Sequence, residues 1–281
     1  MITRFAPSPT GPLHLGHAYS ALLAYDMARQ AGGTFLLRIE DIDQSRARAE
    51  WETQIYEDLH WLGIAWKEPV MRQSDRMEHY YNVINQLWRE GLLYQCHCKR
   101  RDIQAALSAP QEGVSHGPDG MIYPGTCRNT DLHTKGPSPR NAVLRLNIAR
   151  VQNKLSSFRF HDTDQGIVQF SVDDLRHTVG DFIVGRKDSG TSYHLSVVLD
   201  DAAQGVTDVV RGADLFDATK IHVALQGLLG LPTPQYHHHR LIRDDAGKRL
   251  AKRDDSRSIA KYRADGATPN DIRQMIGLSA N

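Results

Sequence analysis

The sequence contains few cysteines and no long apolar run. It has three cysteines in 281 residues, an odd number, so a framework of disulfide bonds is not expected. No apolar run approaches the roughly 18 residues that cross a membrane, and the start, MITRFAP, lacks the apolar stretch of a signal peptide. We therefore expect a cytoplasmic protein without a membrane partner, whose cysteines are metal ligands or buried thiols.

The sequence also lacks an excess of either charge. Its 34 lysines and arginines nearly balance its 33 aspartates and glutamates, so any contact with RNA would have to come from a local basic cluster. The length suits two or three compact units, each with a hydrophobic core. Composition alone is therefore neutral on the partner.

The first thirty residues predict a strand, a tight loop and a helix. An apolar run over residues 2–6 is broken by prolines and a glycine between residues 7 and 12, and apolar residues then recur at helical spacing as far as Met27. A loop that enters a helix presents free backbone N–H groups, which suits a phosphate. His14 and His17 share one face of the first turn and could donate hydrogen bonds to oxygens that gain charge. Alternatively, they are surface histidines at a helix start.

Acidic residues end the next predicted strand. Residues 34–41, TFLLRIED, form an apolar run that ends in Glu40 and Asp41, and in an open α/β sheet such acids lie at the edge where ligands bind. Glu40 is thus expected to face the first loop. The alternative is that the acids only cap the next segment, with Asp43 as the N-cap of a helix. Residues 51–94 have apolar and aromatic residues at helical spacing and are expected to be helical core.

The cysteines lie in two short motifs. CHC occupies residues 96–98, and YPGTC occupies residues 123–127. Two thiols two residues apart can reach one ion, and a third thiol from a distant loop would clamp that loop, as in a structural tetrahedral zinc site. His97 would point away if Cys96 and Cys98 point together, so a fourth ligand is still needed. Reduced thiols without a metal are the alternative.

The second half of the chain predicts further strands and a helix. Residues 193–202, YHLSVVLDDA, are expected to be a buried strand that ends in acids, and residues 209–215, VVRGADL, a strand that ends in charge. Residues 217–230 predict a helix. The three histidines at 237–239 diverge in direction because they are successive residues, so at most two could share an ion. Residues 247–254, GKRLAKRD, form a basic stretch.

Together these motifs resemble the class I aminoacyl-tRNA synthetases of the glutamyl and glutaminyl branch. RFAPSPTG before HLGH looks like the first signature of that family, and RLAKR at 249–253 is similar to the second, usually KMSKS, from which Arg249 and Ala251 depart. The resemblance implies an α/β fold, a Rossmann-type parallel sheet with an inserted zinc-bearing α+β subdomain and a short helical C-terminal segment. It also implies ATP, with Mg²⁺, as a substrate.

The resemblance assigns roles residue by residue. Residues that match the family's ATP site are His14, Gly16, His17 and Lys252, and of these His14, His17 and Lys252 are the expected catalytic groups. Residues that match its glutamate site are Arg4, Ala6, Ser8, Glu40, Tyr193 and Arg211. Glu40 would meet the ammonium group, and Arg211 would pair with the γ-carboxylate through two parallel bonds. Alternatively, Arg211 is a surface arginine at a strand end, and Lys252 belongs to a basic surface loop.

A narrower resemblance is to the glutamyl-queuosine branch, whose metal positions are Cys, Cys, Tyr and Cys. It implies one structural Zn²⁺ per chain, held by Cys96, Cys98, Tyr123 and Cys127. Members of this branch activate L-glutamate without tRNA and place it on the queuosine base in the anticodon loop of tRNA(Asp). Only 28 residues follow Arg253, which is too few for an anticodon-reading domain and agrees with this branch.

The expected organisation follows the family. Residues 1–95 and 191–232 would form the two halves of the nucleotide-binding domain, 96–190 the zinc-bearing insertion, and 233–281 the second-signature loop and a short helical segment. Five basic residues of the insertion are candidate phosphate contacts or part of a solvated face: Arg140, Arg145, Arg150, Lys154 and Arg159.

The expected protein is a monomer that binds L-glutamate, ATP and queuosine-bearing tRNA(Asp). Two other functions stay open at this point. The chain could be the N-terminal catalytic fragment of an ordinary glutamyl-tRNA synthetase, or a non-catalytic RNA-binding or regulatory paralogue.

Overall fold

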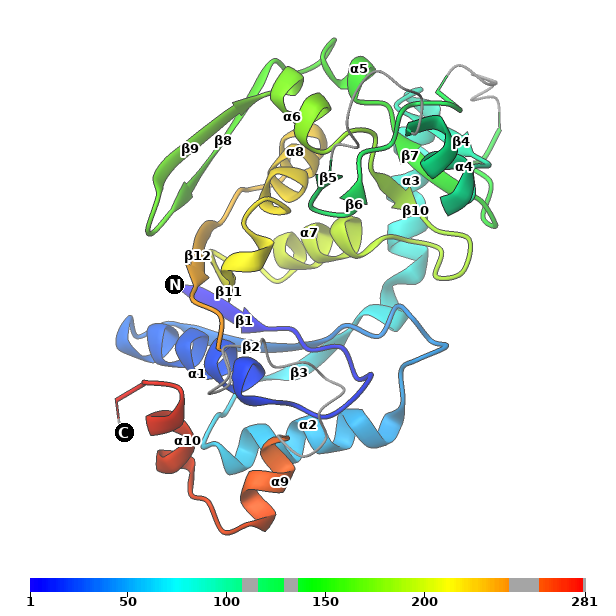
Figure 1. Cartoon of the computed structure of the whole chain (residues 1–281). Helices are drawn as coiled ribbons and strands as arrows, with labels where there is room; N and C mark the ends of the chain where they lie inside the picture. The colour runs from blue at the N-terminus through cyan, green and yellow to red at the C-terminus, as the bar shows by residue number, and fades with distance from the viewer. Residues whose placement is uncertain (108–115, 129–135, 243–257, 280–281) are drawn as a thin grey trace. The chain divides into compact units, whose positions relative to one another are not determined.

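The computed structural model describes residues 1–107, 116–128, 136–242 and 258–279. The chain forms two compact units, each built from separate stretches of sequence. The first unit contains residues 1–75, 205–214 and 234–281, and the second contains residues 76–204 and 215–233. Figure 1 shows the elements of both, and each unit is described by itself.

The first unit is built on parallel strands. Strands β1 (Ile2–Phe5), β2 (Thr34–Ile39) and β3 (Lys67–Arg72) pair in parallel, and β11 (Asp208–Gly212) pairs in parallel with β12 (Gln235–His239). Strand β11 lies beside β1, and the N–H of Thr207 donates to the carbonyl of Ile2 at 3.0 Å, so these strands start together. The order β3-β2-β1-β11-β12 places neighbours on both sides of β1, as in doubly wound nucleotide-binding sheets.

Helices cover the strands of the first unit. Helix α1 (Leu15–Gln30) packs against β1, β2 and β11, while α10 (Pro269–Met275) packs on α1 and α9 (Ile259–Ala264) packs on α2 (Ala49–Trp61). Two 3-10 turns, η1 (Gln73–Arg76) and η2 (Ala213–Leu215), complete the elements at its borders. Most alanines and leucines of α1 are buried, and they join one hydrophobic core with residues from β1, β2 and α2.

The second unit combines helices with short antiparallel sheets. Strand β7 (Val143–Leu146) lies between β4 (Leu93–Cys96) and β10 (Ile183–Gly185), and β8 (Ser157–Asp162) and β9 (Gly166–Ser171) form a hairpin, as do β5 (His116–Gly117) and β6 (Gly120–Met121). Its helices are α3 (Met77–Arg89), α4 (Arg100–Leu107), α5 (Ile148–Val151), α6 (Val172–Thr178), α7 (Tyr193–Ala203) and α8 (Thr219–Leu229).

Two predictions of secondary structure are wrong, and so is one of the alternatives. Residues 193–202 are not a strand but most of helix α7, whose start is capped by the hydroxyl of Ser192. The helix is buried on almost every side, so its apolar run lacks the helical period that would separate it from a buried strand. Residues 51–94 are not helical throughout, because β3 and the start of β4 interrupt them. Asp43 is not the N-cap of α2, which starts after Arg48.

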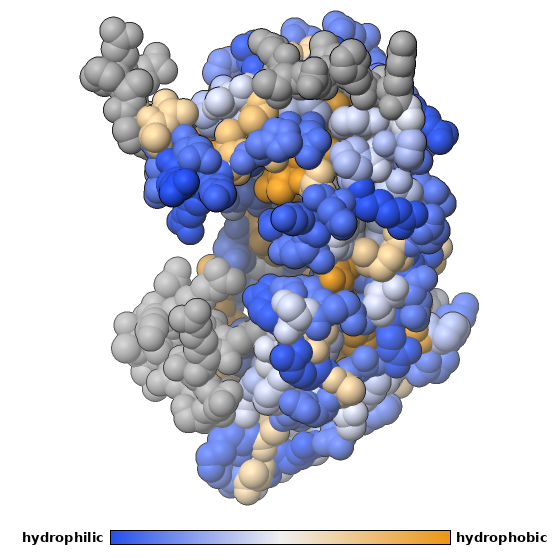
Figure 2. Space-filling view, turned by 90° about the vertical axis from the view of Figure 1, so that its right-hand side faces the viewer, coloured by the Kyte–Doolittle hydropathy of each residue, from blue (hydrophilic) through white to orange (hydrophobic). Residues whose placement is uncertain are grey.

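The described surface offers little apolar area. Among the described residues, the large hydrophobic side chains that are exposed are Met1, Ile167 and Met275. On the face that Figure 2 shows, most described residues are hydrophilic and the hydrophobic ones form small separate patches. Within the described ranges, no helix combines the length and the apolar character needed to cross a membrane.

One buried carboxylate in the first unit destabilises the fold near neutral pH. The side chain of Asp58 on α2 is fully buried, and neither of its oxygens has a hydrogen bond with a described residue. The guanidinium of Arg263 on α9 lies 3.5 Å away. Burial raises the pKa of Asp58 to about 6, although Arg263 opposes the increase. The folded protein therefore binds the Asp58 proton more tightly than the unfolded chain, and stability falls as the pH rises from about 4 to about 6.

Asp58→Asn should stabilise the protein above pH 6, because the buried charge is removed. The raised pKa corresponds to roughly 3 kcal/mol, and we expect a gain of ~1 to 2 kcal/mol at pH 8, since Arg263 loses the charge of Asp58 and keeps only its contact with Glu57 among the ion pairs of the described residues. The gain should disappear near pH 4. Urea unfolding at both pH values measures this gain, with Glu50→Gln, a change at an exposed glutamate of the same helix, as the control. An equal gain in stability at pH 4 and pH 8 would contradict the raised pKa of Asp58.

Candidate functional site

Most of the predicted site residues lie in the first unit, around the ends of its parallel strands. Arg4 lies in β1, Ala6 and Ser8 in the loop that follows, and His14, Gly16 and His17 at the start of α1. Glu40 follows β2 and Arg211 lies near the end of β11. Tyr193 belongs to the second unit, as the first residue of α7. Lys252, with Arg249 and Ala251, lies outside the described residues.

The loop after β1 is held by backbone bonds from the segment after β2. The N–H of Glu40 donates to the carbonyl of Pro7, and the N–H of Arg48 donates to the carbonyl of Pro9, both at 3.0 Å. Glu40 therefore lies against the first loop, as the strand pattern predicts. Its carboxylate accepts a hydrogen bond of 3.0 Å from the guanidinium of Arg38, which is fully buried. Arg38 orients Glu40, and nothing in the sequence singled it out.

His14 and His17 cap the start of α1 through reciprocal hydrogen bonds. Nδ1 of His14 accepts the N–H of Gly16 at 3.1 Å, and Nδ1 of His17 accepts the N–H of His14 at 3.2 Å. The two rings stack with their centroids 3.8 Å apart. This is a capping box in which imidazoles replace the usual hydroxyl and carboxylate. A Cβ atom on Gly16 would come within 3.2 Å of the His14 ring, so glycine there gives the ring its room.

The capping box fixes the tautomer of both histidines. A ring nitrogen that accepts an N–H carries no proton, so each neutral imidazole must carry its proton on Nε2. Two of the backbone N–H groups expected to meet a phosphate are thus bound to imidazoles instead. In both rings the proton therefore lies on Nε2, the nitrogen that does not accept a backbone N–H.

Arg211 is held by β12, the neighbouring strand. Its Nε–H donates to Nε2 of His238 at 3.2 Å, and its guanidinium lies 5.1 Å from the ring centre of Tyr236. Arg211 is only 6% exposed, so a charge that it meets would be paired out of bulk water. The Nε–H bond fixes the plane of the guanidinium, which suits recognition of a planar carboxylate.

The three successive histidines point to three different partners. His237 bonds Asp208 at 2.9 Å, His238 accepts from Arg211, and Nε2 of His239 lies 2.6 Å from the hydroxyl of Ser20. The prediction that they diverge is confirmed. They support the strand and α1, and the group among the described residues that could hold a metal ion lies elsewhere.

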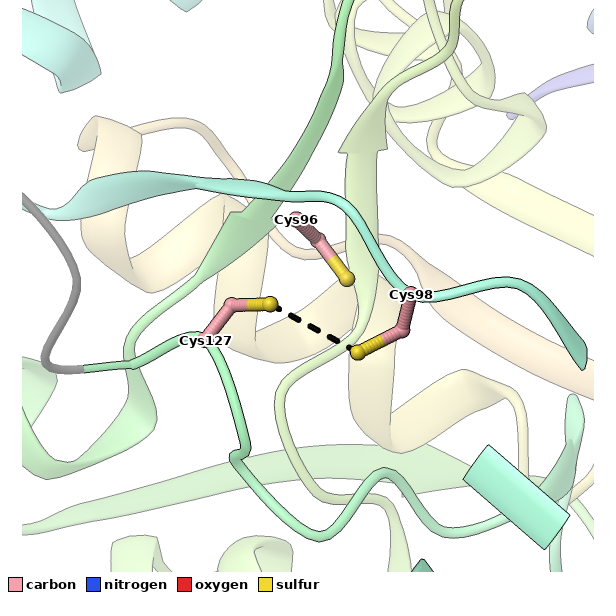
Figure 3. A group of neighbouring side chains, drawn as sticks. All are labelled: Cys96, Cys98 and Cys127. Atoms are coloured by element: carbon pink, nitrogen blue, oxygen red, sulfur yellow. Dashed lines mark hydrogen bonds between the residues drawn. The ribbon is translucent and has the colours of Figure 1, made fainter. Parts of the chain in front are cut away.

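That group is the set of three cysteines in the second unit. Cys96 ends β4, Cys98 follows it by two residues, and Cys127 returns in a later turn, with the sulfur atoms all within 4.8 Å of one another (Figure 3). The hydroxyl of Tyr123 lies 3.5 Å from the sulfur of Cys96 and 3.4 Å from that of Cys98. It also accepts the N–H of Cys127 at 2.9 Å. Three thiols and a phenol therefore converge and could hold a metal ion.

The surroundings of the cluster favour one thiolate. Burial raises the pKa of Cys98 and of the Tyr123 hydroxyl. Burial acts the same way on Cys127, but its interactions with the Tyr123 hydroxyl and the backbone of His97 outweigh it and lower the pKa of Cys127 to about 7. The side chain of His97 is exposed, as the alternation of an extended segment predicts. A cation in the cluster would favour deprotonation of the remaining groups.

Four of the five basic residues proposed as phosphate contacts have partners within the second unit. Arg140 pairs with Glu78, Arg145 donates to the carbonyl of Asp181 and lies over the Tyr123 ring, Arg150 donates to the carbonyl of Gly91, and Lys154 pairs with Glu90. Arg159 on β8 is exposed and has no ion-pair partner among the described residues. Structural roles therefore account for most of this set.

Comparisons with known proteins place this arrangement in a family. A family model described as class I tRNA synthetases (E and Q), catalytic domain, matches residues 1–280. The chain belongs to this family. A protein of Rhodobacter capsulatus named glutamyl-Q tRNA(Asp) synthetase is 58% identical over 99% of this chain and 100% of its own length. One of the same name from Nocardia farcinica is 41% identical over 97% of this chain and 82% of its own length.

Solved synthetases have the same fold. A glutamate tRNA ligase from Elizabethkingia meningosepticum, solved in complex with its amino acid, matches 98% of this chain with a TM-score of 0.74 and 26% identity. A glutamate-tRNA synthetase from Elizabethkingia anophelis matches with a TM-score of 0.75 and 25% identity. This chain spans 60% and 61% of the lengths of these two proteins. The predicted class I, Rossmann-like α/β fold is confirmed.

The tautomers of His14 and His17 can be measured directly. Nitrogen-15 NMR of the imidazoles should show a protonated Nε2 and a bare Nδ1 for both residues. His239 provides the opposite case, because its Nδ1 donates to the carbonyl of Arg240 at 2.8 Å and must carry the proton. Each imidazole signal is assigned by its absence from the spectrum of the matching variant, His14→Gln, His17→Gln or His239→Gln. A proton on Nδ1 of His14 or His17 would contradict the capping box.

Proposed function

We propose that the protein activates L-glutamate with ATP, without tRNA, and transfers the glutamyl group to the queuosine base in the anticodon loop of tRNA(Asp). The observation that carries this proposal is the 58% identity to a glutamyl-Q tRNA(Asp) synthetase over nearly all of both chains. The family supports the ATP-dependent step, and the names of the relatives support the acceptor.

In the activation step, a carboxylate oxygen of glutamate attacks the α-phosphorus of ATP. The new bond gives glutamyl-adenylate, and the bond to the leaving pyrophosphate breaks. The Nε2–H groups of His14 and His17 donate to phosphate oxygens that gain charge in the transition state. Lys252, in the second signature, neutralises charge on the pyrophosphate. Mg²⁺ enters with ATP as part of the substrate.

Recognition of glutamate uses the residues that match the family's pocket. Glu40, oriented by Arg38, receives the ammonium group, and Arg4, Ala6 and Ser8 line the same site. The γ-carboxylate pairs with Arg211, whose guanidinium is held by His238 at 3.2 Å, and accepts a bond from the hydroxyl of Tyr193. Glutamine offers a neutral amide in place of the γ-carboxylate and cannot form this charged pair, so glutamine should be rejected.

The cysteine cluster is proposed to hold one structural zinc ion. Ligand atoms about 2.3 Å from a tetrahedral ion lie roughly 3.7 Å from each other. The sulfurs of Cys98 and Cys127 lie 3.5 Å apart, and the Tyr123 oxygen lies 3.4 Å from the sulfur of Cys98. The donor set Cys96, Cys98, Tyr123 and Cys127 therefore fits the ion. The zinc would clamp the returning loop of the proposed insertion, residues 96–190.

Glutamate-dependent exchange of pyrophosphate into ATP should occur with no RNA present. Arg211→Gln should lower kcat/KM for glutamate at least ~100-fold, the scale of losing a buried charged pair, and change the low activity with glutamine little. Arg159→Gln, an exposed arginine, serves as the control. Exchange only in the presence of tRNA would favour an ordinary glutamyl-tRNA synthetase, and an unchanged Arg211→Gln enzyme would show that the pocket is misplaced.

Metal analysis tests the zinc proposal. The purified protein should contain about one zinc per chain, and Cys98→Ser should release it. His97→Ala, the exposed residue between two ligands, should keep the metal because its side chain points away. If protein purified under reducing conditions contains no zinc, or if both variants lose zinc equally, the zinc proposal is wrong and the cysteines are buried thiols.

A further inference from the structure

Three side chains of the second unit form a continuous hydrogen-bonded chain. Nε2 of His194 lies 3.0 and 3.1 Å from the two carboxylate oxygens of Asp119, and its Nδ1 lies 3.0 Å from Nε2 of His222. Both histidines are buried, with exposed fractions of 7% for His194 and 1% for His222. These residues come from α7, α8 and the turn between β5 and β6.

The hydrogen bonds between these three side chains have a defined donor-to-acceptor direction. Although partial burial raises the pKa of Asp119, the bond from His194 lowers it below its usual value, so Asp119 is a carboxylate and can only accept. Nε2 of His194 is therefore the donor to Asp119. In a neutral His194, Nδ1 must then accept, and it receives the Nε2 proton of His222. One acceptor at the turn thus sets the proton positions on two buried rings.

Tyr193 is packed against both rings of this chain. Its ring centre lies 5.3 Å from that of His194 at an interplanar angle of 66°, and 5.7 Å from that of His222 at 56°. The backbone of Tyr193 is fixed as well, because it follows Ser192, whose hydroxyl caps α7 and whose N–H donates to the carbonyl of Val184 at 2.9 Å. The two imidazoles therefore lie against the Tyr193 ring and restrict the direction of its phenol.

The turn that carries Asp119 is itself held in place. It has the sequence GPDG at residues 117–120, a turn signature, and Gly120 has a φ of 101°, which favours glycine. A Cβ atom on Gly117 would lie 2.5 Å from the carbonyl of Thr178, and Tyr123 forms a bridge with Gly180. The hairpin is thus fixed against the segment 178–180, and Asp119 has a defined position.

We infer that Asp119 and His222 are positioning residues for glutamate recognition: through the rings of His194 and His222 they hold the Tyr193 phenol in the direction in which it contacts the substrate. This inference rests on the proposed function, because it takes Tyr193 as a contact of glutamate. It adds residues that resemble no signature motif and that touch no substrate atom.

The exposed position of Asp119 makes the inference testable without unfolding the protein, because its side chain is 54% exposed. Asp119→Ala should raise KM for glutamate about five-fold in the pyrophosphate exchange assay, the scale of one partly exposed hydrogen bond. The KM for ATP and the melting temperature should not change. Asp119→Asn keeps an acceptor oxygen for His194 and should restore most of the affinity.

Asp173→Ala is the matched control, because Asp173 makes a similar contact of 3.6 Å with His177 on the exposed side of α6. His222→Phe keeps an aromatic ring but removes the donor, and its effect should not add to that of Asp119→Ala.

An unchanged KM for glutamate in Asp119→Ala would overturn the positioning role, and so would equal effects of the Ala and Asn variants or equal increases in both KM values. A parent protein that shows no glutamate-dependent exchange would instead refute the proposed function, and the positioning role with it.

Discussion

The candidate site depends on how the start of α1 satisfies its backbone. The first N–H groups of a helix have no partner within it, and here the Nδ1 atoms of His14 and His17 accept two of them. These contacts set the tautomers of both rings, which stack on each other. The loop before it is pinned through Pro7 and Pro9, and the helix is tied to β12 by Ser20 and His239. The hydrogen bonds that hold the two imidazoles at this helix start are thus formed before any ligand binds.

Sequence patterns were sufficient wherever local chemistry decides the structure. Strand β1, helix α1 and strand β2 follow from apolar periodicity and from the breakers between them. The spacing of Cys96, Cys98 and Cys127 was enough to expect convergence, because an extended segment places alternate residues on one side. The divergence of the three histidines from 237 to 239 follows from the same rule.

Patterns failed where burial on all sides removes the periodic signal. Helix α7 has buried residues on almost every face, so YHLSVVLDDA looks the same as a buried strand. The supporting residues were missed for another reason. His238 and Asp119 matter because of the side chains that they meet across the fold, and a single sequence contains no record of those pairings. Arg38 lies only two residues before Glu40, but nothing in the sequence singled it out. Their partners Glu40 and Arg211 were found through resemblance to family motifs, and Lys252, found in the same way, lies outside the described residues.

The central claim is that glutamate is placed on a base of tRNA(Asp), and the most direct measurement maps where it goes. Purified tRNA(Asp), with and without queuosine, is incubated with the protein, ATP and radioactive glutamate, and the labelled nucleotide is identified after nuclease digestion. We expect the label on the queuosine nucleotide of the anticodon loop, and none on tRNA that lacks queuosine. Label on the 3′-terminal ribose, independent of queuosine, would contradict the account.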